Sequence, residues 1–217
     1  MNVAFVTVGQ APRDDLVPEL LSHLRTEIPY SEFGALDDLG RDEIGFLAPS
    51  EGEARLCTRL RDGTEVVTSR SKTAERLNGI FARLDEERYD LIVLLCTGYF
   101  DGLSCRALFI ESQRLVDGFV ASVAHGGKEV GILVPLAEQI VQHDEASAGY
   151  AIAGAAHASP YSDGDLEAAA RELSETDLIV MHCMGYTEEM RRRVAAASGK
   201  PVILSRRIVA AGMEQFV

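Results

Sequence analysis

The chain has 217 residues, of which 47% are hydrophobic and 25% are charged. This length and composition fit one large or two small folded domains and exclude disordered and fibrous proteins. Its 34 acidic residues outnumber its 21 basic ones, and the net charge of −13 argues against nucleic-acid binding. No apolar run approaches the roughly 18 residues that span a bilayer. The first ten residues lack the basic start and cleavage region of a signal peptide, so we expect a cytoplasmic protein with no membrane partner.

Hydrophobic periodicity and turn residues predict alternating strands and helices. In chain order, the first half reads as a strand at 3–8, a helix after Pro12, a loop at 32–53 with a short helix near 41–46, a hairpin with strands at 56–60 and 65–68, a helix at 71–88, strands at 91–95 and 107–110, and a helix at 114–124. The second half reads as a strand at 130–134, a helix at 137–148, a strand at 151–158, a helix at 163–174, a strand at 178–182, a helix at 188–197, a strand at 201–204 and a helix at 206–216.

An internal repeat organises these elements. Residues 90–99 and 177–186 are identical at seven of ten positions and share the pattern Cys-x-Gly-Tyr. Chance likeness between two buried strands would explain the aliphatic run but not that pattern. We therefore predict an α/β fold of two pseudo-symmetric domains, each with a mainly parallel sheet flanked by helices. The first domain covers residues 1–117 with the C-terminal helix at about 206–217, and the second covers 118–205.

Of the four cysteines, Cys57, Cys96, Cys105 and Cys183, two occupy equivalent positions in this repeat. Cys96 and Cys183 each follow a strand directly, where ligands bind in open α/β sheets. We expect a helix to begin soon after each of them, which would lower the thiol pKa. Facing each other, the two thiols would act as an acid/base pair on a carbon acid. We interpret Cys57 and Cys105 as structural, and no cysteine spacing indicates a metal site.

Two cysteines that each close a strand in a duplicated α/β chain resemble the aspartate/glutamate racemase superfamily. Its usual motifs are Cys-Asn-Thr and Gly-Cys-Thr, whereas this chain has Cys96-Thr97-Gly98 and Cys183-Met184-Gly185. The resemblance implies two domains with an active site between them, where a pair of thiols can work without a cofactor. Members of the superfamily include racemases, a maleate isomerase and a decarboxylase, so the fold alone does not fix the reaction.

A closer likeness is to the AroM family of that superfamily. The segments that carry it are 7–14, 34–37, 60–63 and 109–114, and they extend the likeness over nearly the whole chain. The AroM likeness brings no particular activity with it.

The candidate substrate-binding residues lie next to these strand ends. Arg13 would grip a carboxylate through two parallel hydrogen bonds, although an ion pair with Asp14 or Asp15 is equally compatible with the sequence. Gln10 is a ligand contact or a turn residue, and Arg114 reaches the cleft or pairs with Glu111 or Asp117. The remaining candidates are the backbone groups of Thr97, Gly98, Met184 and Gly185.

Two further segments are weighed and set aside. Residues 69–72 precede a helix and could bind an anion, but we favour a solvated capping segment. His182 adjoins Cys183 on a strand, so its side chain should point to the opposite face and should not pair with that thiol.

The sequence therefore predicts a cofactor-independent racemase or isomerase acting on a small carboxylate through Cys96 and Cys183. The alternatives are a lyase or decarboxylase that uses one thiol, and a binding protein that keeps the cleft without catalysis. We expect no metal, no cofactor and a homodimeric assembly.

Overall fold

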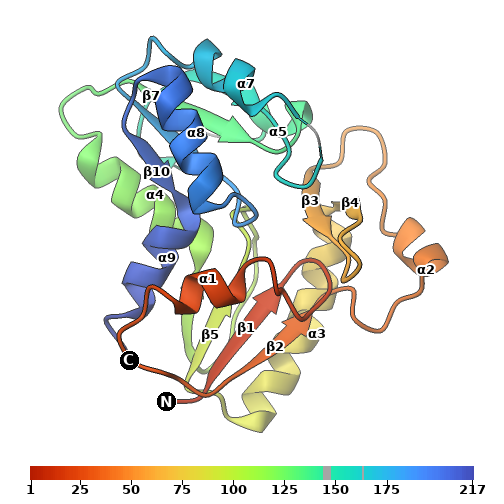
Figure 1. Ribbon diagram of the computed structural model, residues 1–217. Helices are drawn as coiled ribbons and strands as arrows, with labels where there is room; N and C mark the ends of the chain where they lie inside the picture. Colours follow the sequence, from red (N-terminus) through yellow and green to blue (C-terminus); the bar gives the residue numbers. More distant parts are fainter. Residues whose placement is uncertain (144–147, 163) are drawn as a thin grey trace.

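Two four-stranded parallel sheets and a hairpin form the framework of the chain, shown as a computed structural model in Figure 1. The structure describes residues 1–143, 148–162 and 164–217. The first sheet has the order β2-β1-β5-β6, from β1 (Val3–Thr7), β2 (Tyr30–Gly34), β5 (Leu91–Leu94) and β6 (Leu108–Glu111). The second has the order β10-β9-β7-β8, from β7 (Val130–Val134), β8 (Ile152–His157), β9 (Leu178–Met181) and β10 (Val202–Leu204). The antiparallel hairpin is β3 (Arg55–Arg59) and β4 (Glu65–Ser69).

Helices connect these strands and cover the sheets. The described ones are α1 (Val17–Leu21), α2 (Arg41–Gly45), α3 (Arg70–Glu87), α4 (Ser112–Val123), α5 (Ala137–Ile140), α7 (Leu166–Glu172), α8 (Glu188–Ser198) and α9 (Ser205–Met213). Among the described residues, no helix is both long and apolar enough to cross a bilayer. The predicted α/β class with two mainly parallel sheets is confirmed.

The repeat seen in the sequence is also a repeat of topology. Matching β1 to β7, β2 to β8, β5 to β9 and β6 to β10 converts the strand order of one sheet into that of the other. Side-chain hydrogen bonds follow the same correspondence. The Ser112 hydroxyl donates to the Leu94 carbonyl at 2.5 Å, and the Ser205 hydroxyl donates to the Met181 carbonyl at 2.7 Å. Both serines begin a helix and are fully buried.

The last helix of each half packs against the sheet of the other half. Val116 and Val120 of α4 lie in the core of the second sheet, beside Val130 and Ile132. The apolar face of α9, from Val209 to Met213, packs instead against β1 and β5 of the first sheet. This exchange joins the two halves through buried apolar surface (Figure 1). The boundary at residues 117/118 stays a prediction.

Most predicted elements are confirmed within two or three residues, with two differences. Strand β2 lies in a segment predicted as loop, because it is an edge strand of polar sequence that pairs only with β1. The helix predicted at 137–148 is described only as α5, which ends at Ile140. Residues 144–147 of that prediction lie outside the described residues, as does residue 163 of the helix predicted at 163–174.

Equivalent positions should give equivalent losses of stability. Ser112→Ala and Ser205→Ala each remove one hydrogen bond from a buried carbonyl that still accepts from a backbone N–H, so each should lower the free energy of unfolding by about 0.5–1.5 kcal/mol. Ser122→Ala is the control, since the Ser122 hydroxyl bonds a helix carbonyl at an exposed position. Urea denaturation measures all three. A loss of stability in only one of the two buried variants would contradict the equivalence.

Candidate active site

The central strands of both sheets end at one cavity, whose lining includes residues that follow β1, β5, β7 and β9. Its open volume of about 50 Å³ has room for a few water molecules or a compact ligand. The hairpin contributes a further wall from β3. The lining residues are Val8, Arg13, Arg55, Leu56, Cys57, Thr58, Arg70, Leu95, Cys96, Thr97, Gly98, Tyr99, Val134, Pro135, Gln139, Gln142, His143, Tyr161, His182, Cys183 and Met184.

The two Cys-x-Gly turns present their thiols to this cavity in the same way. The Gly185 N–H donates to the Cys183 sulfur at 3.3 Å, and the Gly98 N–H makes the equivalent bond to Cys96. Because N–H donors stabilise a thiolate more than a thiol, each turn favours ionisation of its own cysteine. Thr97, Gly98 and Met184 join the two cysteines in the lining.

Burial nevertheless dominates the acidity of both thiols. Desolvation raises the pKa of Cys96 to about 12, against the opposing effects of the Gly98 N–H and Arg13. Desolvation also raises the pKa of Cys183, which the Gly185 N–H and Arg13 partly offset. The predicted lowering by a helix N-terminus is wrong. Residues 96–107 contain no helix, and α8 begins only at Glu188, after its cap Thr187.

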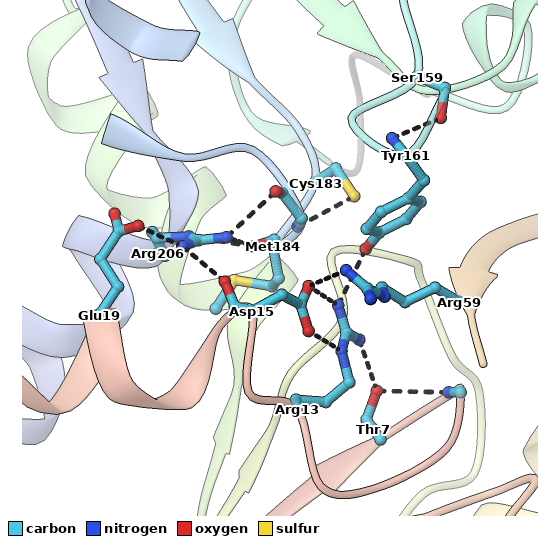
Figure 2. A network of polar contacts seen from close by, with 12 residues as sticks. Thr7, Arg13, Asp15, Glu19, Arg59, Ser159, Tyr161, Cys183, Met184 and Arg206 are labelled. Atoms are coloured by element: carbon cyan, nitrogen blue, oxygen red, sulfur yellow. Dashed lines mark hydrogen bonds and ion pairs between the residues drawn. The ribbon is translucent and has the colours of Figure 1, made fainter. Parts of the chain in front are cut away.

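Arg13 lines the cavity, but its guanidinium is already engaged. It is 3% exposed, and its two parallel hydrogen bonds go to Asp15 at 2.8 Å each. Its remaining contacts are the Thr7 hydroxyl at 3.0 Å and the Tyr161 hydroxyl at 3.1 Å (Figure 2). The ion pair with Asp15, which the sequence left open, is therefore present and buried. Arg13 acts on the two thiols mainly through its charge.

Tyr161 fills the space between Arg13 and Cys183, and sequence reasoning missed it. It lies on the loop between β8 and α7, and Figure 2 shows its ring directed at both of these side chains. Ser159 on the same loop bonds Glu65 of the hairpin. A Cβ on Gly185 would stand 2.3 Å from the Tyr161 hydroxyl, so only glycine leaves room for this ring. No local pattern signals that packing.

The charge of the cavity opposes the charge of the chain. Arg13, Arg55 and Arg70 line it, whereas no aspartate or glutamate does among the described residues. Arg55 has an ion pair with Glu138 at 3.8 Å. Arg70 opens α3, and its guanidinium has no hydrogen bond or ion pair with any part of the chain that the structure describes. Arg70 lies in the segment that we interpreted from sequence as a solvated cap.

Three predicted contacts lie outside the lining. The Gln10 side chain donates to the Leu36 carbonyl and accepts from the Arg61 N–H, as a turn residue would. The Arg114 side chain is 74% exposed and pairs with Glu111 at 2.6 Å, which is the alternative that the sequence left open. Gly185 acts through its N–H on Cys183. Cys57, interpreted as structural, does line the cavity, whereas Cys105 does not.

Arg206 fixes the turn that carries Cys183. Its guanidinium donates to the carbonyls of Met184 and Gly185 and pairs with Glu19 of α1 at 2.7 Å (Figure 2). The sequence predicts no role for Arg206. Among the described residues, no group of three or more His, Cys, Asp or Glu side chains could hold a metal ion.

Solved structures similar to this one include racemases, maleate isomerases and a decarboxylase. The maleate cis-trans isomerase of Nocardia farcinica matches with a TM-score of 0.62 at 14% identity, covering 99% of this chain and 91% of that one. The aspartate racemase of Picrophilus torridus matches with 0.60 at 12% identity, covering 99% and 94%. Arylmalonate decarboxylase matches with 0.55 at 14% identity, covering 99% and 92%. The chain therefore has the aspartate/glutamate racemase fold.

The sequence itself places the chain more narrowly. It matches the family described as AroM protein over residues 3–217, and the chain belongs to that family. A search of curated protein sequences found no match.

Buried neutral thiols make stability depend on alkaline pH. Between pH 9 and 12 an unfolded cysteine ionises while folded Cys96 stays protonated. The folded state then holds more protons, so the free energy of unfolding must fall as pH rises, by at most about 1.4 kcal/mol per pH unit for each thiol. Urea denaturation at several pH values should show a smaller slope in Cys96→Ser than in the unsubstituted protein. Equal slopes would mean that Cys96 is not shielded from water.

Proposed function

We propose that this protein is a cofactor-independent isomerase of the racemase type, acting on a small carboxylate in the cavity between the two sheets. The observation that carries the proposal is the composition of that cavity. Two cysteines in equivalent Cys-x-Gly turns share it with three arginines, and no acidic residue lines it among those described. Arg13 and Arg55 are paired with Asp15 and Glu138, whereas Arg70 has no ion pair among the described residues and gives the cavity a positive charge that favours an anionic ligand by direct Coulomb attraction.

The proposed reaction transfers one proton to a cysteine and another from a cysteine. One of Cys96 and Cys183, as the thiolate, takes the proton from the carbon next to the carboxylate and becomes a thiol. The other thiol gives its proton to the opposite face of that carbon and becomes the thiolate. Arginine charge stabilises the electron pair that the carbon releases into the carboxylate. Proton count and charge balance within the pair, and the reverse reaction exchanges the two roles.

Arg70 is the stronger candidate for holding the carboxylate. The two parallel N–H donors of Arg13 already bond Asp15. Arg70 also lines the cavity, and its guanidinium has no acidic partner among the described residues. Arg70 stands at the start of the 18-residue helix α3, whose positive end adds to its attraction for an anion. Arg13 would keep a role as the positive charge beside both thiols and as the partner of Tyr161.

A second candidate function is favoured by the raised thiol pKa values. At neutral pH both cysteines are in the acid form, and a single thiol in that form is ready to protonate a carbanion left by decarboxylation. Arylmalonate decarboxylase, which shares the fold, is named for a reaction that loses carbon dioxide. The two functions differ in how many of the cysteines are essential.

The experiment that separates them is α-proton exchange in D2O, followed by NMR over a pool of small carboxylates. For a two-thiol isomerase, Cys96→Ser and Cys183→Ser should each abolish interconversion of the two enantiomers. The serine hydroxyl is a far weaker acid than a thiol, so it is not ionised at neutral pH and cannot act as the base. One of the two variants should still exchange the proton of a single enantiomer. Cys105→Ser is the matched control, because Cys105 does not line the cavity, and it should keep full activity.

The contrary outcomes are specific. A dead Cys183→Ser beside a largely active Cys96→Ser would replace the isomerase by the one-thiol reaction. No exchange by the unsubstituted protein over the whole pool, with thiols that titrate like free cysteine, would remove catalysis and leave a binding protein.

The role of Arg70 has its own test. Arg70→Ala should weaken the binding of any carboxylate that the cavity accepts by at least about tenfold, the usual effect of losing a charged hydrogen bond. Arg114→Ala removes the same charge from an exposed site outside the cavity lining and should change the affinity little. Calorimetry measures both. Equal effects would show that only the overall charge of the chain matters.

A further inference from the structure

A chain of buried hydrogen bonds leads from Asp117 to the cavity. The Asp117 carboxylate accepts from the Gln113 amide at 2.8 Å, from the Tyr99 hydroxyl at 2.8 Å and from the Tyr150 hydroxyl at 3.1 Å. The oxygen of Tyr150 also lies 2.9 Å from Nε2 of His182. His182 is 3% exposed and lines the cavity. The proposed isomerase reaction uses none of these groups.

The Asp117 carboxylate at one end of this series of hydrogen bonds determines where each proton lies. Burial raises the pKa of Asp117, and the hydrogen bonds from Gln113, Tyr99 and Tyr150 oppose that effect. All three groups donate to the carboxylate and stabilise its ionised form, so Asp117 offers only acceptors. The single hydroxyl proton of Tyr150 therefore points to Asp117. The bond between Tyr150 and His182 then needs a proton from the imidazole, and Nε2 of His182 must be the donor.

The other ring nitrogen of His182 is left as a bare acceptor. Burial lowers the pKa of His182 well below its ordinary value, so the ring is neutral and carries one proton, which Nε2 holds. Nδ1 of His182 is buried and has no hydrogen-bond partner among the described residues. The neighbouring ring of His143, 4.6 Å away between centroids, supplies none, although its own Nδ1 is also unpartnered.

We propose that His182 determines the ligand class, its Nδ1 accepting a hydrogen bond from the hydroxyl or ammonium group of a small 2-hydroxy or 2-amino carboxylate. This inference rests on the proposed binding of a carboxylate in the cavity. In this proposal Arg70 attracts the carboxylate, and the donor group on the next carbon bonds Nδ1 of His182. A ligand without that donor leaves the buried acceptor unpaired, and sites of this kind reject such ligands strongly.

The first test is the tautomer of His182. In protein labelled with nitrogen-15 at histidine, the NMR shifts of the ring nitrogens distinguish a protonated from a bare nitrogen. We expect Nε2 protonated and Nδ1 bare at neutral pH. In Tyr150→Phe the acceptor for Nε2 is gone, so Nδ1 should become partly protonated. A proton on Nδ1 in the unsubstituted protein, or a charged ring, would overturn the inference.

The second test compares ligands matched in size. Lactate and alanine each add one donor group to propionate, and the two distinguish a hydroxyl from an ammonium ligand. At least one of them should bind at least about tenfold tighter than propionate and shift the Nδ1 resonance of His182. Tyr150→Phe and His182→Phe should lose this preference while keeping the affinity for propionate.

The contrary results are equally defined. Propionate binding as tightly as both other ligands, or no shift at Nδ1 with any of the three, would overturn the inference. Failure of the proposed isomerase leaves a different signature. A preference for lactate or alanine that persists in the Cys96→Ser, Cys183→Ser double variant, without proton exchange in any form, would keep the role of His182 and remove catalysis.

Discussion

The arrangement of the cavity depends on the hydrogen bonds of the buried Arg206 guanidinium. It is fully buried, and its hydrogen bonds reach the Cys183-Met184-Gly185 turn of the second half and Glu19 on the first helix. An unpaired charge at such a depth would be strongly destabilising, so the turn and α1 must stay where they satisfy it. Met184 adds an apolar contact by packing into the core beneath the first sheet. The position of Cys183 relative to the first half follows from these contacts.

The duplicated architecture explains why two thiols meet at one cavity. Each half ends a central strand in Cys-x-Gly, and each Gly N–H bonds the sulfur two residues before it. The helix exchange between the halves packs α9 against the first sheet and α4 against the second, which brings the carboxyl ends of the central strands to the same place. Around the cavity the two halves are no longer equivalent. Arg206 occupies the repeat position of Gln113, and the Tyr161 loop has its contacts with Arg13 and Cys183.

The sequence predicted those features of the fold and of the candidate site that a local pattern of residues determines. Unbroken aliphatic runs predicted the central strands, and the repeat of Cys-x-Gly-Tyr predicted which cysteines would be equivalent. It was uninformative about β2, whose pairing with β1 is decided by the sheet and not by its polar residues. Arg70, Tyr161 and His182 were missed or set aside for a related reason. Tyr161 joins the cavity through long-range packing, and its neighbours in the chain give no sign of that environment. The place of Arg70 before a helix and of His182 beside Cys183 could be seen in the sequence, but not that both residues line the cavity.

The central claim is that Cys96 and Cys183 act on opposite faces of one ligand carbon. A crystal structure with a small carboxylate bound in the cavity tests it most directly. The account predicts the two sulfurs on either side of the carbon next to the carboxylate, each within about 3–3.5 Å, the approach that proton transfer needs. Both sulfurs on one side of the ligand, or a ligand held away from the two Cys-x-Gly turns, would contradict it.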